Sequence, residues 1–146
     1  MSEIVTLREE RDYVFTIELG GTAGTLRSDL PPPLGGGSGA SPEHLLCAAV
    51  GSCLSSSLLF SLRKFKQAPE PIRATVEPEV GRNEQKRLRV LRLKARIDLG
   101  VPAAKLGEHL DKALAQFEDF CTVTASVRQS LPVDVEIYDA DGTRLK

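Results

Sequence analysis

The stretch Ser41-Pro-Glu-His-Leu-Leu-Cys-Ala-Ala-Val-Gly-Ser-Cys53, SPEHLLCAAVGSC, opens the segment that decides the fold of this 146-residue chain. Its first three residues suit the N-cap, the first position and the acidic first turn of a helix. Residues 45–62, LLCAAVGSCLSSSLLFSL, carry no charge, and basic residues follow from Arg63. Side chains that are apolar or small on all sides are typical of a helix surrounded by protein. The sequence therefore predicts a long, buried central helix.

The same uncharged segment is at the lower length limit for crossing a membrane. However, five of its 18 residues are serine, and the amphipathic segments on both sides need an apolar partner that a bilayer would remove. The N-terminal residues are charged from Glu3 onward and lack the apolar stretch of a secretory signal. We therefore expect a cytoplasmic protein with no membrane association, in which the three cysteines are reduced.

Alternation of apolar and polar residues predicts strands over residues 3–8, 13–19, 25–30, 72–80, 88–99 and from 133 onward, with a polar turn over residues 9–12. Val90 beside Leu91 breaks the alternation, so we expect a bulge there. A second helix should begin at Pro102, and a shorter helical piece should end near Ser130. The second helix would carry an apolar stripe, formed by Leu106, Leu110, Ala113, Leu114 and Phe117.

Hairpin connections between neighbouring strands predict an α+β fold, with a mostly antiparallel sheet wrapped around the central helix. The length predicts one domain over residues 1–146. Six short strands and one further helix supply too little cover for an apolar helix of this length. We therefore predict an intertwined homodimer.

Several kinds of site are set aside. Nineteen Lys and Arg against 20 Asp and Glu, with 5% aromatic residues, argue against nucleic-acid binding. Residues 31–41, PPPLGGGSGAS, predict a flexible loop rather than a dinucleotide fingerprint, which must follow a strand and open a helix. His44 and His109 lack the spacing of a zinc site with the cysteines. We expect no cofactor and no metal.

The cysteines carry the chemistry. Cys53 ends the run of small residues, and Cys121 follows Phe120 at the end of the second predicted helix. With the Gly-rich loop and the Pro-Glu helix start, this chain resembles the family of osmotically inducible protein C and the organic hydroperoxide resistance proteins over nearly its whole length. The resemblance implies a thiol peroxidase that reduces organic hydroperoxides. Cys53 would attack the peroxide, Cys121 would resolve the sulfenic acid as a disulfide, and an external dithiol would reduce that disulfide.

A thiolate in an apolar site needs a nearby cation, because desolvation raises the pKa of a cysteine. The resemblance implies an arginine from the N-terminal strands, held by the glutamate at the helix start, which is Glu43 here. If the Gly-Gly-Arg sequence of the family is aligned with Gly20-Gly21-Thr22, the arginine is lost, because Thr22 takes its place. If the first turn of the N-terminal strands is aligned instead, Arg11 takes the position of the arginine. We assign Arg11 to this role. The alternatives are Arg27 and Arg8.

Glu43 and Cys53 are ten residues apart, about 15 Å along a helix, which is too far for one hydrogen-bonded cluster. Glu43 should therefore act on the site of the other subunit, as the resemblance also implies. Two features depart from the family pattern. Thr122 stands where many members have proline after the second cysteine, and Cys47 is an additional thiol, which we expect to be buried and inert.

Alternative interpretations remain at this stage. Glu43 could serve only the helix dipole, and each cysteine could be a core residue. The chain could be a redox sensor or a small-ligand-binding module that has lost the peroxidase chemistry, or a scaffold dimer with no pocket. For an active enzyme, the apolar walls of the helix favour alkyl or lipid peroxides over hydrogen peroxide.

Overall fold

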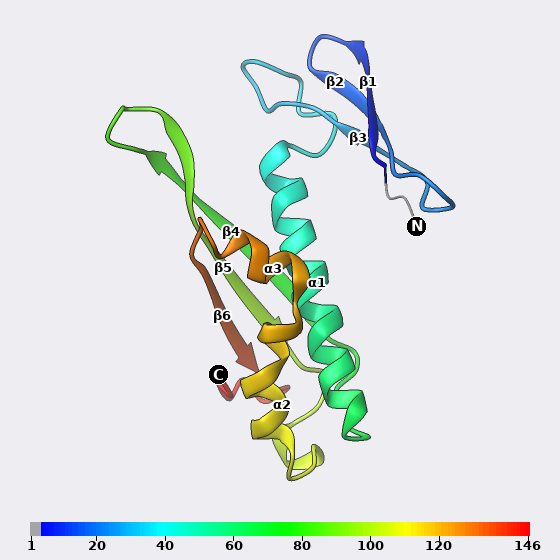
Figure 1. The fold of residues 1–146 in the computed structure, drawn as a ribbon, viewed down its shortest axis with the longest axis vertical. Coiled ribbons are helices and arrows are strands. Elements are labelled where there is room, and N and C mark those ends of the chain that lie inside the picture. Colours follow the sequence, from blue (N-terminus) through cyan, green and yellow to red (C-terminus); the bar gives the residue numbers. More distant parts are fainter. Residues whose placement is uncertain (1–3) are drawn as a thin grey trace. The chain divides into compact units, whose positions relative to one another are not determined.

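The computed structural model describes residues 4–146, and their contacts divide the chain into two compact units, residues 1–46 and residues 47–146. Figure 1 shows the helices and strands of both units. The first unit holds the N-terminal sheet and the loop that leads into the central helix. The second unit holds most of that helix, the second sheet and the remaining helices.

The first unit contains three antiparallel strands in the order β1-β2-β3: β1 (Thr6–Arg11), β2 (Val14–Glu18) and β3 (Thr25–Ser28). The predicted polar turn over residues 9–12 is wrong, because β1 continues to Arg11 and the turn is confined to Asp12 and Tyr13. Every residue of β1 is exposed, so its charged side chains fit a strand as well as a turn. Glu3, the start of the predicted first strand, lies outside the described residues.

The loop after β3 is organised by the buried carboxylate of Asp29. This carboxylate accepts hydrogen bonds from the backbone N–H groups of Leu30 (2.8 Å), Gly36 (3.2 Å) and Ser38 (2.9 Å), and from the Ser38 hydroxyl (2.8 Å). The Ser38 N–H makes the largest contribution to holding the pKa of Asp29 below its usual value. The glycine-rich loop that the sequence predicts is present, and Asp29 holds its middle in one conformation.

The second unit contains a three-stranded sheet in the order β4-β5-β6, formed by β4 (Arg73–Arg82), β5 (Leu88–Asp98) and β6 (Val133–Tyr138). β4 and β5 are antiparallel, and the register skips Leu91, which confirms the predicted bulge. β6 runs parallel to β5 because the helical segment between them crosses back along the sheet. The α+β fold with mostly antiparallel strands is confirmed, and the parallel last pair is an addition to it.

The central helix α1 (Pro42–Lys64) begins at the predicted residue. Along the part of α1 in the second unit, one face is buried, and it consists of Cys47, Val50, Gly51, Leu54, Leu58, Ser61 and Leu62. The opposite face is open, and its Phe60 is 70% exposed. By length and composition alone, α1 could cross a membrane, a test that core helices of soluble proteins also pass. Within residues 47–146, the helix is therefore covered along one face only.

Gly51 sets the distance between α1 and β4. A Cβ atom at this position would lie 3.0 Å from Cγ2 of Val76, closer than most side-chain contacts. Helix and strand therefore approach each other more closely than two larger residues would allow. Gly51 lies two residues before Cys53, so this contact fixes the turn of α1 that carries the thiol.

The predicted second helix is interrupted. Its first part is only a short 3-10 turn, η1 (Ala103–Lys105), which ends where Leu106 adopts an extended conformation before Gly107. Three short elements follow, α2 (Leu110–Gln116), η2 (Phe117–Phe120) and α3 (Thr122–Val127). A continuous helix from Pro102 is therefore wrong, although most of the predicted stripe is fully or nearly fully buried, as at Leu106, Ala113, Leu114 and Phe117.

We predict that Asp29→Asn loosens the loop, because the neutral amide has one acceptor oxygen where the carboxylate has two. The backbone amides of Gly36 and Ser38 should then exchange hydrogen faster, as measured by NMR at neutral pH. In the unmodified chain, the lowered pKa of Asp29 keeps this stabilisation fully present above about pH 4. It should be lost as the pH falls through the lowered value. Asp12→Asn, in the exposed hairpin turn, is the control, and equal exchange in both variants would contradict the role of Asp29.

Candidate active site

Cys53 and Cys121 meet in the second unit. Cys53 lies in the middle of α1 and is partly exposed, whereas Cys121 immediately precedes α3 and is fully buried. The two thiols are hydrogen-bonded to each other, and neither is in a disulfide. The structure thus brings together two cysteines that are 68 positions apart in the sequence, as the resemblance implied.

The surroundings of Cys53 favour its thiolate. Burial would raise the pKa of Cys53, but hydrogen bonds from the Cys121 thiol, the Val123 and Thr124 backbone N–H groups and the Ser57 hydroxyl together lower it. Three of these donors come from residues 121–124, and Ser57 lies one helical turn beyond Cys53 on α1. Cys53 therefore has the lowered pKa expected of a reactive cysteine.

The surroundings of Cys121 have the opposite effect. Burial and the hydrogen bond to Cys53 raise the pKa of Cys121, and the bonds from Thr124 offset this only in part. One proton shared by two sulfurs gives a coupled pair, in which one is the thiolate and the other the donor. The opposite shifts of the two pKa values favour the thiolate at Cys53 and the proton at Cys121.

The start of α3 supplies the backbone donors. Cys121 is its N-cap and has an extended backbone, so the first N–H groups of the helix have no acceptors within it. Val123 and Thr124 lie in that first turn, and their N–H groups instead meet the sulfur of Cys53. Thr124 is fully buried, and its Oγ1 lies 3.0 Å from Sγ of Cys121; while Cys121 is a thiol, either group can donate the hydrogen bond between them.

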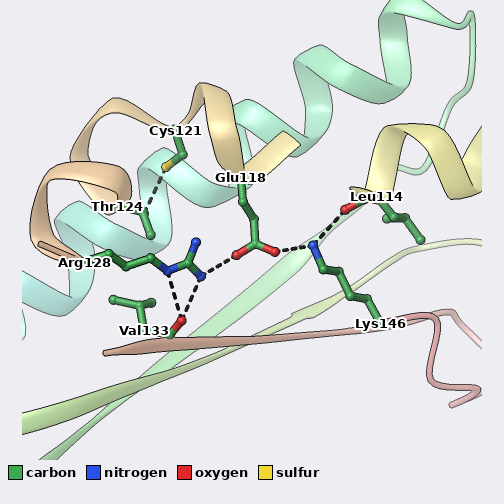
Figure 2. A network of polar contacts seen from close by, with 7 residues as sticks. All are labelled: Leu114, Glu118, Cys121, Thr124, Arg128, Val133 and Lys146. Carbon is green, nitrogen blue, oxygen red and sulfur yellow. Dashed lines mark hydrogen bonds and ion pairs between the residues drawn. The ribbon is translucent and has the colours of Figure 1, made fainter. Parts of the chain in front are cut away.

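A partly buried ion-pair network holds the segment that carries Cys121 (Figure 2). The carboxylate of Glu118, whose side chain is 12% exposed, pairs with both Arg128 and Lys146. Arg128 also donates two hydrogen bonds to the carbonyl of Val133 at the start of β6, at 3.2 Å and 2.8 Å. Burial would raise the pKa of Glu118, and its two cationic partners lower it overall. The network joins both ends of the segment around Cys121 to the sheet and to the C-terminal residue.

A recess of about 370 Å³ lies between α1 and β4. It is lined by small or short residues, namely Cys47, Ala48, Gly51, Ser52, Ser55, Ala74 and Val76. Cys53 is not among them, since its sulfur meets the start of α3 instead. The buried thiol of Cys47 therefore belongs to a different side of the helix from the Cys53–Cys121 pair.

The candidate arginines lie in the first unit, where Glu10 is a shared partner. Arg11 is 3.7 Å and Arg27 is 3.5 Å from its carboxylate, while Arg8 pairs with Glu18. Glu43 is in the first turn of α1 and is half-buried. The activation of Cys53 by Arg11, and the part of Glu43 in it, stay predictions. Over residues 4–146, no three His, Cys, Asp or Glu side chains form a group that could hold a metal ion.

Three residues of the site, Ser57, Thr124 and Glu118, are not among those that the sequence predicts. Ser57 could have been found, because it is four residues from Cys53 on a predicted helix and so shares its face. The roles of Thr124 and Glu118 have no signature in the sequence. The role of Thr124 depends on where α3 begins, and that of Glu118 depends on its contact with Lys146. The sequence predicts a separate helical piece after Cys121, but it does not predict the residue at which that piece begins, and the positions of its free N–H groups depend on that residue.

We predict that Cys121→Ala raises the pKa of Cys53, because the variant removes a hydrogen-bond donor from its thiolate. The pH dependence of alkylation by iodoacetamide, with the modified residue identified by mass spectrometry, measures this value. Cys47→Ala is the matched control and should leave the pKa of Cys53 unchanged. A Cys53 with the pKa of a cysteine in a model peptide, about 8.5, would contradict the site geometry.

Comparison with known proteins places this geometry in a family. Residues 35–136, more than half of the chain, match the model of the OsmC-like protein family. No curated protein matches the sequence. The match begins after β3, so the N-terminal strands with the candidate arginines lie outside it.

Solved structures share the fold at low sequence identity. An OsmC-like protein of unknown function from Vibrio cholerae is 20% identical, with a TM-score of 0.75 over 94% of this chain and 99% of that one. An organic hydroperoxide resistance protein OsmC from Legionella pneumophila is 18% identical, with a TM-score of 0.69 over 94% and 96%. The organic hydroperoxide resistance protein OhrB of Bacillus subtilis is 15% identical, with a TM-score of 0.68 over 94% and 98%. With the family match over residues 35–136 and this shared fold, the chain belongs to the OsmC-like protein family.

Proposed function

We propose that this protein is a two-cysteine thiol peroxidase that reduces organic hydroperoxides to alcohols. The observation that carries the proposal is the division of roles between the two sulfurs. Cys53 is partly exposed and has a lowered pKa, while Cys121 is fully buried and has a raised pKa. A peroxidatic thiol must be ionised and reachable, and a resolving thiol must be adjacent to it.

In the first step, the thiolate of Cys53 attacks the terminal oxygen of the hydroperoxide and the O–O bond breaks. The sulfur is oxidised to a sulfenic acid, and the alkoxide leaves and is protonated to the alcohol. In the second step, Cys121 attacks the sulfenic sulfur, forms the disulfide and releases water. A low-potential external dithiol then reduces the disulfide and restores both thiols. This cycle needs a reducing compartment, in agreement with the cytoplasmic location that the sequence predicts.

Exposed apolar side chains near the two thiols favour an apolar peroxide. Phe60 follows Cys53 by two helical turns on the same side of α1 and is 70% exposed. Phe120 and Val123, on either side of Cys121, are 71% and 37% exposed. An alkyl chain would gain free energy by covering such surfaces, whereas hydrogen peroxide would not.

The decisive experiment mixes the reduced protein with cumene hydroperoxide and follows peroxide loss together with intact mass. We expect the protein to lose two hydrogens by forming a Cys53–Cys121 disulfide, and to turn over when a dithiol is added. Cys53→Ser should abolish both results, whereas Cys47→Ser should retain them. A protein that consumes no peroxide would instead be a redox sensor or a ligand-binding module with the same fold.

The open face of α1 supports the homodimer as part of the proposal. Ala48, Ala49, Ser52 and Ser56 are exposed there with Phe60, and small side chains of this kind allow a second chain to approach closely. α1 is one unbroken helix, so Glu43 and Cys53 of one chain are about 15 Å apart along it. In the proposed dimer, Glu43 and Arg11 of each chain complete the site formed by the cysteines of the other.

Mixed dimers test this arrangement. Arg11→Met and Cys53→Ser chains should each be inactive alone, but their mixed dimer would contain one intact site. Co-expression of the two chains should therefore restore about a quarter of the peroxidase activity, because half of the dimers are mixed and each has one working site. Co-expression of Arg11→Met with Glu43→Gln is the control and should restore nothing. No recovery in the first mixture would show that each site is built within one chain.

A further inference from the structure

We propose that the hydroxyl of Thr124 is a catalytic group of the resolving step, in which it stabilises the sulfur of Cys121 as that sulfur attacks oxidised Cys53. The inference rests on the proposed function and assigns a role within its second step. It is carried by the 3.0 Å contact between Thr124 Oγ1 and Cys121 Sγ, by the full burial of both residues and by their positions in one helical turn.

Buried Cys121 needs such a partner. Water cannot solvate a developing thiolate there, because both Cys121 and Thr124 have no exposed surface. A buried charge must receive its hydrogen bonds from the protein. A thiolate has no proton and can only accept, so in the bond between these two atoms the Thr124 hydroxyl must be the donor. In Figure 2, the sulfur of Cys121 faces the Thr124 side chain.

Cys121 needs this hydrogen-bond donor only after Cys53 has been oxidised. In the reduced protein, the proton of Cys121 serves the thiolate of Cys53. In the resolving step, that proton leaves with the hydroxyl group of the sulfenic acid as water, while the S–O bond breaks and the S–S bond forms. Negative charge therefore develops on the Cys121 sulfur as it gives up its proton, and it passes to the departing oxygen, which takes up that proton. The Thr124 hydroxyl can donate a hydrogen bond to this charged sulfur without moving, because the two atoms are already in contact.

The Glu118 network keeps this geometry in place. Glu118 and Arg128 lie on either side of the segment that contains Cys121 and Thr124, and their ion pair closes that segment against β6. The hydroxyl and the sulfur are therefore held together by a rigid support rather than by the short helix alone. A valine at position 124 would have nearly the same shape, so packing by itself gives no reason for the hydroxyl.

Two pairs of variants isolate the hydroxyl. Thr124 and Thr124→Val differ in the hydroxyl and have similar shapes, and so do Thr124→Ser and Thr124→Ala. In a rapid acid quench after one equivalent of cumene hydroperoxide, intact mass distinguishes the sulfenic acid from the disulfide. The decay of the sulfenic acid to the disulfide is a separate step from its formation, so its rate is compared among the four proteins whatever the rate of the first step. Disulfide formation should be about tenfold slower in the Val and Ala variants, the effect of losing one hydrogen bond to a developing charge.

Thr124→Ser should remain within about threefold of the unmodified rate, since it keeps the donor. Equal rates of disulfide formation within both pairs, or slowing of the Ser variant as much as the Ala variant, would overturn the proposal. If Thr124→Val does not fold, the Ser and Ala pair still measures the effect of the hydroxyl.

A second oxidant separates this inference from the proposed function. Diamide forms an adduct with an accessible thiolate, and attack by Cys121 on the Cys53 adduct gives the same disulfide and releases the hydrazine. If peroxide leaves the unmodified protein unoxidised, the peroxidase proposal fails, and the four rates with diamide still decide the role of Thr124. Slower disulfide formation in the variants without the hydroxyl would support that role, and equal rates would exclude it.

Discussion

A thiolate inside a protein needs hydrogen-bond donors to replace the water it has lost, and the contact between α1 and the start of α3 supplies them to Cys53. The N–H groups of Val123 and Thr124 are available because α3 begins immediately after Cys121, and the thiol of Cys121 is adjacent for the same reason. The interruption between η2 and α3 thus provides the N–H donors that favour the thiolate of Cys53, and it also carries the second sulfur, that of Cys121. The rest of the second unit holds these two elements at the required separation.

Two features maintain that separation. On one side of α1, Gly51 allows the helix to lie close to Val76 of β4, which fixes the turn that carries Cys53. On the other side, Glu118 binds Arg128 and Lys146, so the segment with Cys121 is joined to β6 and to the C-terminal residue. The first is a packing contact and the second is electrostatic. Removing either cation would leave the partly buried carboxylate of Glu118 with one partner fewer, so the network resists loosening of the short helices that it holds.

The sequence was sufficient to predict the elements whose signals are local. The start of α1, the bulge at Leu91 and most of the buried stripe around Leu114 follow from caps and from apolar periodicity. The pairing of Cys53 with Cys121 came from the family resemblance. The polar β1 and the interruption of the second helix could not be predicted, because exposed charged strands resemble turns and because Leu106 continues the apolar stripe of the predicted helix although its backbone is extended. Glu118 and Thr124 escaped notice because their partners are set by tertiary structure alone.

In the proposed cycle, the unequal exposure of the two sulfurs decides which of them the reductant attacks. Cys121 has no exposed surface, whereas Cys53 is partly open. In the proposed disulfide, an incoming reductant can therefore approach only the Cys53 sulfur, so Cys121 must be the leaving group and the mixed disulfide must form on Cys53. The donors around Cys121 that assist its attack would also assist its departure, because both steps pass through the same anionic sulfur. In the proposed cycle, the buried surroundings of Cys121 would therefore act on both the formation and the reduction of the disulfide.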